Sequence, residues 1–200
     1  MNFGLISSLL RNPTSGWEQV RQSDFTIAQC YTRYVVPLSL ITAVAAYIGT
    51  SQVGWRVGSG DPVTLTADSA LRLSGMTFLA MLVVVFVLAK TIHWMAATYD
   101  AKTSLNHCFS LAVFSAIPLY LVGITLLYPI PWLIYLVGLP ALGYSVALLY
   151  SGVPTIMEIN KEKGFLFASA ILAFGLVSLV GLIVVTISLW GFGFGPVFRT

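Results

Sequence analysis

Titratable residues gather around one short loop near the middle of the chain. Lys90, His93 and Asp100 follow one another at helical steps of three and seven, and His107 and Cys108 come just after the loop. Imidazole, thiolate and carboxylate groups all bind metals, so a metal site is the first chemistry to consider. Their spacing matches no metal-binding motif, however. We therefore expect solvated helix ends here, with no metal and no cofactor.

Nucleophilic catalysis has less support still. Ser110, Ser115 and Ser145 lie in apolar segments with no histidine at mid-helix to activate them, and neither GxSxG nor HExxH occurs. The glycine-rich run from Gly191 to Gly195 follows no predicted strand and precedes no lysine, so it is not a phosphate loop. Cys30 forms no CxxC pair, and we expect it and Cys108 to stay reduced. The sequence predicts no enzyme.

A long segment without charged residues indicates that the elements carrying these side chains are membrane-spanning helices. From Thr103 to Met157 the chain has no Asp, Glu, Lys or Arg, and charged residues make up 8% of the chain against about 25% in soluble domains. A hydrocarbon core about 30 Å thick needs about 20 apolar residues per helix, so this run is long enough for two spans. The prolines and aromatic rings of Tyr128–Trp132 supply the turn between them. The chain is predicted to be a polytopic membrane protein.

Five spans are predicted, so the fold class is all-α. The chain forms a single domain, 1–200, in which a bundle of five transmembrane helices follows an N-terminal amphipathic interfacial segment, 1–32. The spans cover about 34–50, 71–96, 104–127, 132–151 and 164–190. No Asp, Glu, His, Lys or Arg lies at mid-span, which argues against an ion-coupled carrier because such groups are costly in lipid and are kept for function.

Basic residues predict the orientation, because cytoplasmic loops are enriched in Lys and Arg. The side of the N-terminus holds seven: Arg11, Arg21, Arg33, Lys90, Lys102, Lys161 and Lys163. The other side holds three: Arg56, Arg72 and Arg199. We therefore expect a cytoplasmic N-terminus and a periplasmic or extracellular C-terminus. The basic residues are scattered despite a net charge of +3, so we expect no nucleic-acid partner.

The N-terminal segment is expected to form amphipathic helices on the cytoplasmic membrane surface. Three apolar residues share one face of the first helix: Phe3, Ile6 and Leu10. Ser15 and Glu18 have the spacing of a capping box that would start the second helix. Trp17 and Val20 then give this helix an apolar stripe. A simple interfacial anchor and a helix that docks a partner both remain open.

Small residues at four-residue spacing predict close helix packing. Gly143, Ala147 and Ser151 form such a ladder on the fourth span, and Ala45 and Gly49 repeat it on the first. The fifth span carries two sets on different faces: Gly164 with Ala168, and Gly175 with Ser178 and Gly181. Packing inside the bundle is the first interpretation, and self-association or a partner helix is the second. Two prolines inside spans three and four are expected to kink them: Pro118 and Pro140.

Three aromatic and proline motifs resemble those of a known family. They are Pro13-x-x-x-Trp17, Tyr31-x-x-Tyr34-Val-x-Pro37 and Tyr144-x5-Tyr150-x-Gly152-Val-Pro154, and a charged turn, Glu158–Lys163, follows the last. The chain resembles the Yip (Ypt-interacting protein) family, particularly its bacterial inner-membrane branch. The resemblance implies five helices with a cytoplasmic N-terminus and an outside C-terminus. Eukaryotic relatives are associated with Rab-type GTPases, but the Asp-Leu-Tyr-Gly-Pro motif of those relatives is missing here, so we do not expect Rab binding.

These observations favour a non-enzymatic integral membrane protein that associates through its helices with membrane proteins or lipids. The expected partners are the lipid bilayer, other membrane proteins or a second copy of the chain. The candidate positions are the family-motif and packing residues: Pro13, Trp17, Tyr34, Pro37, Gly143, Ala147, Tyr150, Gly152 and Pro154. The alternative is a small transporter or channel for a neutral or amphipathic solute, since kinked helices can line a cavity.

Overall fold

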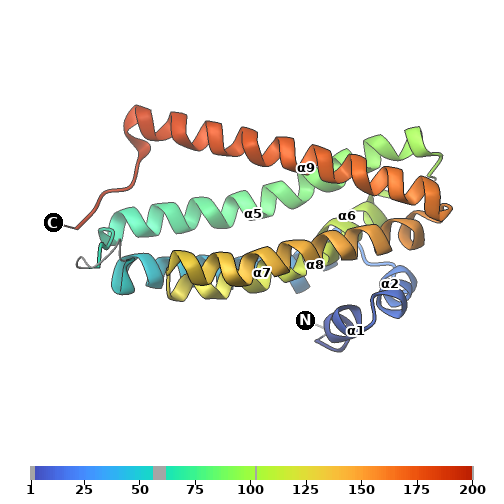
Figure 1. Ribbon diagram of the computed structural model, residues 1–200, viewed down its shortest axis with the longest axis horizontal. Helices are drawn as coiled ribbons and strands as arrows, with labels where there is room; N and C mark the ends of the chain where they lie inside the picture. The colour runs from blue at the N-terminus through green and yellow to red at the C-terminus, as the bar shows by residue number, and fades with distance from the viewer. Residues whose placement is uncertain (1–2, 56–61, 102, 200) are drawn as a thin grey trace.

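The computed structural model describes residues 3–55, 62–101 and 103–199 as an assembly of helices (Figure 1). Four of these helices are long and apolar enough to cross a membrane, and a bent pair makes a fifth crossing when it is counted as one span. The predicted all-α membrane fold is therefore confirmed. Two of the basic residues that predicted the orientation lie outside the described residues: Arg56 and Lys102.

Two short helices, α1 (Phe3–Arg11) and α2 (Pro13–Gln22), form an N-terminal hairpin. Asn12 caps α2, its side chain accepting a hydrogen bond from the Ser15 backbone N–H at 3.5 Å. The predicted Ser15–Glu18 capping box is therefore wrong, because Pro13 already provides the fixed φ of the first helical position and the helix starts three residues earlier. A capping box does occur at the next helix, between Thr26 and Gln29.

The first crossing is continuous from Ile27 to Val53, so it starts seven residues before the predicted span at 34–50. It consists of α3 (Ile27–Cys30), the π-helical turn η1 (Tyr31–Val35), α4 (Val36–Ile48) and η2 (Gly49–Val53). In η1 the Val36 N–H bonds the Tyr31 carbonyl. Pro37 has no N–H to continue the regular ladder, which explains the wider turn just before it.

The second and third crossings are joined by a tight turn. Helix α5 (Ala67–Ala96) continues into η3 (Ala97–Tyr99), and Asp100 ends it in the left-handed region with a φ of 55°. The third crossing is broken into α6 (Leu105–Ser115), α7 (Ile117–Val122) and η4 (Gly123–Leu127). Its two halves meet at a bend of 41°. The predicted kink is thus confirmed near Pro118, whose ring requires the preceding turn to open.

The last two helices are longer than predicted. Helix α8 (Pro131–Met157) extends six residues past the predicted span and runs through Pro140 and Pro154 without a break. The family-motif residue Pro154 therefore lies inside the helix. After Glu158, in the left-handed region, α9 (Lys161–Leu189) and η5 (Trp190–Phe194) complete the bundle. The predicted turn at Tyr128–Trp132 is confirmed at Tyr128, Pro129 and Ile130, which lie between η4 and α8, whereas Pro131 and Trp132 already start α8.

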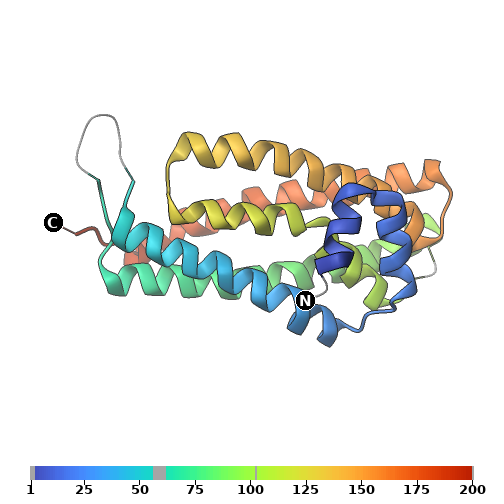
Figure 2. The ribbon, with the colours of Figure 1, turned by 90° about the horizontal axis from the view of Figure 1, so that it is seen from below.

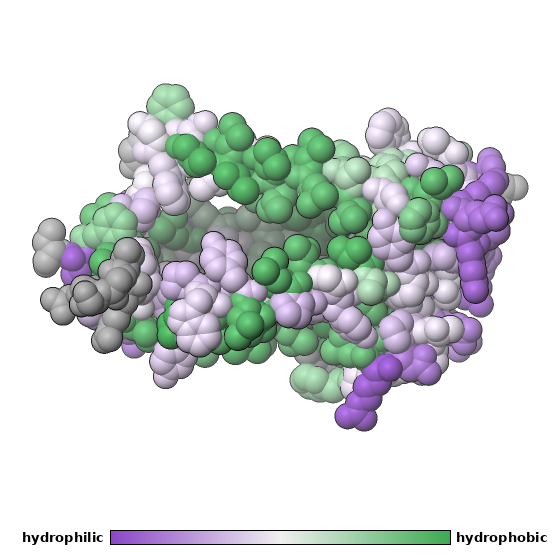
Figure 3. Space-filling view, in the orientation of Figure 1, coloured by the Kyte–Doolittle hydropathy of each residue, from purple (hydrophilic) through white to green (hydrophobic). Residues whose placement is uncertain are grey.

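The helices run side by side, and the α1–α2 hairpin lies across α8 (Figures 1 and 2). We call the end that holds the turns after α5 and α8 the N-terminal end of the bundle, and the opposite end the C-terminal end. In Figure 3 a green apolar belt covers the middle, and charged residues gather at the N-terminal end. This distribution matches a bilayer around the belt.

Close packing is concentrated toward the N-terminal end. The fully buried aromatic side chains include Trp17, Tyr34, Phe109, Phe114 and Phe167. By contrast, α9 is exposed on nearly all sides beyond Gly175. In Figure 1 its far half stands away from α5. The bundle is therefore compact at one end and open at the other.

A short strap closes the C-terminal end. Leu65 and Phe198 form an isolated β-bridge, and the Val197 N–H donates to the Ser69 hydroxyl at 3.0 Å. Trp55 and Val63 form a second bridge within the loop after the first crossing. Between the end of η2 at Val53 and the start of α5 at Ala67, the described residues are otherwise irregular. The strap (Gly195–Arg199) thus ties the end of α9 to the start of α5.

Replacing Gly49 by Ala should destabilise the protein. A Cβ at Gly49 would lie 1.8 Å from the Leu126 carbonyl oxygen, so the backbones of the first and third crossings would have to separate. We expect a loss of about 1–3 kcal/mol, typical of overpacking. Gly75→Ala is the matched control, because its Cβ would meet nothing within 4 Å. That change should stabilise by about 0.5–1 kcal/mol through helix propensity. Thermal unfolding in mild detergent measures both, and equal effects of the two variants would contradict this packing.

Candidate functional site

Two family motifs meet where the hairpin crosses α8. The Trp17 ring is fully buried against Gly152, where a Cβ would lie only 2.5 Å from the Trp17 Cε2 atom. The indole N–H donates to the Ser151 hydroxyl at 3.2 Å. Only a glycine leaves room for the ring, and the hydroxyl satisfies the indole N–H, which usually finds a partner when buried. Trp17 and Gly152, which lie far apart in the sequence, therefore form one contact.

The other residues of the Tyr150–Pro154 motif contact α9. The Tyr150 hydroxyl lies 2.8 Å from the Ser169 hydroxyl, and the Pro154 ring fills the space above Gly164, where a Cβ would lie 2.6 Å from its Cγ atom. Three alternate positions of α8 thus face two neighbours, the hairpin through Gly152 and α9 through Tyr150 and Pro154.

The Tyr31–Pro37 motif forms a second contact between helices. The Tyr31 hydroxyl donates to the Leu82 carbonyl of α5 at 2.8 Å. The Tyr34 ring lies fully buried against Phe114 of α6, with centroids 4.9 Å apart. Pro37 sits at the start of α4, after the π-helical turn that turns both tyrosines inward. This motif therefore joins the first three crossings.

The hairpin is held by further polar contacts. The Tyr144 hydroxyl donates to the Leu10 carbonyl at 2.7 Å, and Arg21 pairs with Glu158 at 2.6 Å. Pro13 starts α2 and fixes its entry angle. The apolar stripe of Trp17 and Val20, which could have faced lipid as an interfacial anchor or docked on a partner, is buried against the chain's own bundle. Helical periodicity locates an apolar face but does not say whether lipid or protein covers it.

The titratable residues near the central loop are drawn into pairs. His107 lies 3.5 Å from Asp24, and Lys163 lies 2.5 Å from Asp100. The Cys108 thiol approaches the His93 Nδ1 atom at 3.9 Å. Among the described residues no group of three or more such side chains could hold a metal ion. Because the Lys163 ammonium bonds the Asp100 carboxyl, it holds the pKa of that carboxyl below its ordinary value. The pairs link the turns after α5 and α8 and the hairpin.

Some of the predicted small-residue ladders pack against another helix of the chain, and others have no helix against them. Ala45 is buried and Gly49 lies against Leu126, so that ladder packs inside the bundle as expected, and so do Gly164 and Ala168. The second set on α9 is open, since nothing lies within 4 Å of a Cβ at Gly175 or Gly181 and Ser178 is exposed. Gly143 and Ala147 are exposed as well, and nothing lies within 4 Å of a Cβ at Gly143. Internal packing is therefore wrong for this part of α8, because the hairpin and α9 occupy the flanking faces and leave this one uncovered.

Two close approaches were missed from the sequence. A Cβ at Gly16 would lie 2.4 Å from the Leu9 Cα atom, where α1 and α2 cross, and one at Gly123 would lie 2.2 Å from the Thr42 hydroxyl. A glycine inside a helix costs up to about 1 kcal/mol relative to alanine, so its presence can mark such a crossing. The partner of each glycine could not be predicted, because it comes from another helix.

Comparisons with known proteins agree with the motifs. The chain matches the model of the Yip1 domain over residues 7–196. It is 39% identical over 189 residues to inner membrane protein YohC of Escherichia coli K12, an alignment that covers 94% of this chain and 97% of the relative. YohC of Escherichia coli O6:H1 gives the same identity and coverage. No solved structure matches the chain.

Trp17→Ala should release the hairpin from α8. The change removes a fully buried ring and the hydrogen bond to Ser151, so we expect a loss of about 3–5 kcal/mol. Limited proteolysis at Arg11 and Arg21 in mild detergent should become much faster. Phe3→Ala is the control, because the Phe3 side chain is 71% exposed, and it should change neither the free energy of unfolding nor the rate of proteolysis. Unchanged proteolysis of Trp17→Ala would show that other contacts hold the hairpin.

The Asp100–Lys163 pair should restrain the two turns at neutral pH, and this restraint should be lost in acid. Because the folded pKa of Asp100 is lowered from 3.8, the pair's contribution is present above that value and is lost as the pH falls through the folded pKa. Spin labels at Thr98→Cys and Glu162→Cys should give a narrow distance distribution at neutral pH that broadens only once the pH falls below 3.8 and Asp100 becomes protonated. With Asp100→Asn the distribution should be broad at both. A distribution independent of pH in the parent chain would rule out this tether.

Proposed function

Because the chain belongs to the Yip1-domain family of membrane proteins, as its motifs predicted, we propose that it is a non-enzymatic inner-membrane protein that acts by lateral association of its helices. The N-terminal end of the bundle is proposed to face the cytoplasm and the C-terminus the periplasm. Basic residues support this orientation, since Arg21 and Lys163 lie at the N-terminal end beside the two turns.

The contrast between filled and open glycines carries the proposal. At Gly49, Gly123, Gly152 and Gly164, atoms of a neighbouring helix occupy the space that a Cβ would need. Gly143 meets nothing, and Ala147 continues its exposed face one turn further along α8. In lipid there is little hydrophobic drive between helices, so small residues that allow close backbone contact favour association. This open face of α8 is suited to a second transmembrane helix.

A second copy of the chain is the proposed occupant. Two copies related by a two-fold axis would place the same face of α8 in each copy against that of the other. The backbones of the two α8 helices could then approach closely at Gly143 and Ala147. The flanking side chains Leu139 and Leu142 are 65% and 44% exposed and would cover the edges of the contact. Another membrane protein with a similar helix could bind in the same way. We do not expect Rab-type GTPases to bind, since the hairpin is short and docked on α8.

The absence of a catalytic role is part of the proposal. Titratable side chains near the loop are paired with one another, and the serines within the crossings lie among apolar residues. Ser110 lies 3.6 Å from the Cys30 thiol and Ser115 bonds the Ala112 carbonyl. These contacts are typical of hydroxyls that serve packing.

Transport of a neutral or amphipathic solute is the alternative function. The bend between α6 and α7 favours it, because bent helices can line a cavity. A hollow of about 580 Å³ between α5, α7 and α9 is lined mostly by apolar side chains and opens sideways (Figure 3). A solute path would instead join the two ends of the bundle with polar groups. The geometry therefore supports association over transport.

Gly143→Cys should crosslink two copies in native membranes under mild oxidation. The native thiols of Cys30 and Cys108 are buried, so the unmodified chain serves as the background. Val177→Cys is the control, because its side chain is 72% exposed on α9 and lies outside the α8 face, so it should crosslink less. Gly143→Leu should abolish association without destabilising the single chain, because nothing lies within 4 Å of the added Cβ. Equal crosslinking at Val177→Cys, or none at Gly143→Cys, would count against the α8 contact.

A further inference from the structure

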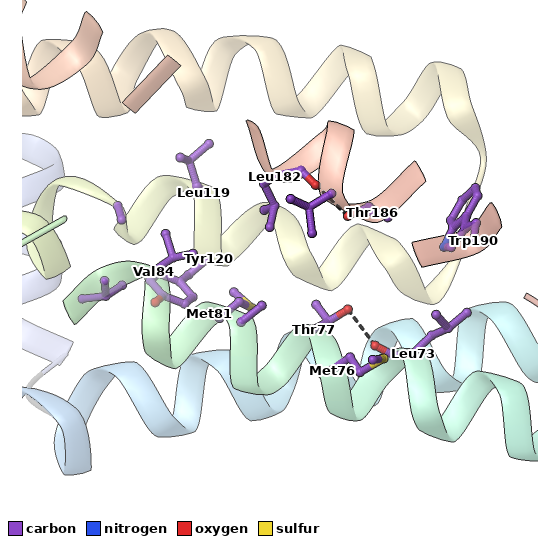
Figure 4. A pocket seen from close by; sticks show the side chains of 14 residues that line it. Leu73, Met76, Thr77, Met81, Val84, Leu119, Tyr120, Leu182, Thr186 and Trp190 are labelled. Carbon is purple, nitrogen blue, oxygen red and sulfur yellow. Dashed lines mark hydrogen bonds between the residues drawn. The ribbon is translucent and has the colours of Figure 1, made fainter. Parts of the chain in front are cut away.

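A lateral groove runs between α5, α7 and α9 in the open half of the bundle. Its volume is about 580 Å³, within the range of about 300–1,000 Å³ usual for ligand pockets. Figure 4 shows side chains of all three helices converging on it, including Met76 and Met81 of α5, Leu119 of α7 and Leu182 of α9. In Figure 3 the hollow lies beneath α9 within the apolar belt. The groove is separate from the open face of α8.

The lining selects an apolar ligand. The hydroxyls of Thr77 and Thr186 already donate to the carbonyls of Leu73 and Leu182, each at 2.8 Å. The hydroxyl oxygen of Tyr120 is buried, so it does not face the groove. A polar ligand would lose its hydrogen bonds to water without replacement, at a cost of several kcal/mol for each group. Methionines, which adapt to irregular apolar shapes, form part of the wall.

The ends of the groove exclude a transmembrane helix as occupant. At the N-terminal end α9 returns to the bundle, where the rings of Phe167 and Tyr99 stack 4.7 Å apart. At the C-terminal end the strap ties α9 to Ser69 of α5 through Val197. A spanning helix needs about 30 Å of open length and would meet both closures. A hydrocarbon chain has a free end and can enter between α5 and α9 from the side.

We propose that this groove binds an acyl chain of a membrane phospholipid, inserted laterally between α5 and α9. The chain would fill the space between the two helices and so replace the dispersion contacts that α9 lacks beyond Gly175. On the orientation proposed above it would come from the outer leaflet. The groove itself makes no demand on the headgroup, because its lining offers apolar contacts. The lipid thus acts as part of the helical bundle.

Photocrosslinking in vesicles tests the groove directly. The protein is reconstituted into vesicles of phosphatidylethanolamine and phosphatidylglycerol that contain a phospholipid with a diazirine midway along one acyl chain. Mass spectrometry of peptides then locates the adducts. We expect adducts at Met81 and Leu182 in the groove, as well as at Val177 and Val180, which are 72% and 61% exposed on α9 and report general lipid contact. Phosphatidylethanolamine and phosphatidylglycerol probes should give the same groove adducts.

Filling the groove separates specific binding from general lipid contact. Ala80→Phe from α5 should remove the adducts at Met81 and Leu182 and leave those at Val177 and Val180. Thr186→Phe, from the opposite wall, should do the same and covers the case in which one variant fails to fold. Leu79→Phe is the matched control, since Leu79 is 61% exposed and does not line the groove.

Two results would overturn the proposal. The first is adducts at Met81 and Leu182 that persist in both filled variants that fold. The second is the absence of lipid adducts at Met81 and Leu182 together with disulfide crosslinking of two copies through Met76→Cys, which would assign the groove to a second copy. Because crosslinking through Gly143→Cys uses a different face, failure of either proposal leaves the other intact.

Discussion

The contact between the Trp17 ring and Gly152 organises the N-terminal half of the molecule. The ring reaches the α8 backbone because residue 152 has no side chain, and it brings the whole hairpin with it. On the same helix Tyr150 and Pro154 hold the start of α9. One turn of α8 therefore fixes the elements on both of its sides. Since the driving force between helices in lipid is small, such close contacts decide the arrangement.

The opposite half depends on lipid instead. Beyond Gly175 the side chains of α9 are exposed, and the strap at Val197 restrains the helix only at its end. A water-soluble protein could not leave such a surface uncovered, but a bilayer covers it at no cost. The closely packed N-terminal half, which we call the locked half, gives the protein one defined shape. The open half holds the lateral groove, and we propose that this groove and the exposed α8 face bind other molecules in the membrane.

The sequence predicted the crossings and their turns well, because missing charges and prolines act locally. It also singled out Trp17, Tyr34, Tyr150 and Gly152 as family-motif or packing positions, and each of them makes a contact between helices, but it did not show that Trp17 and Gly152 touch. It failed where one apolar face had to be told from another. The stripe of Trp17 and Val20 faces protein, while the ladder at Gly143 is open, and both look alike in sequence because lipid and protein interior are equally apolar. Only the tertiary arrangement separates them.

The division of the bundle into a locked and an open half can be measured along α9. Single spin labels at successive positions from Gly164 to Ile187, in lipid nanodiscs, report the accessibility of each side chain to oxygen dissolved in the bilayer. The account predicts helical minima at Phe167, Ala168 and Ile171, which are buried, and no further regular minima beyond Gly175. Minima that continue with the same period and depth to Ile187 would mean that α9 is packed along its full length, and would contradict the account.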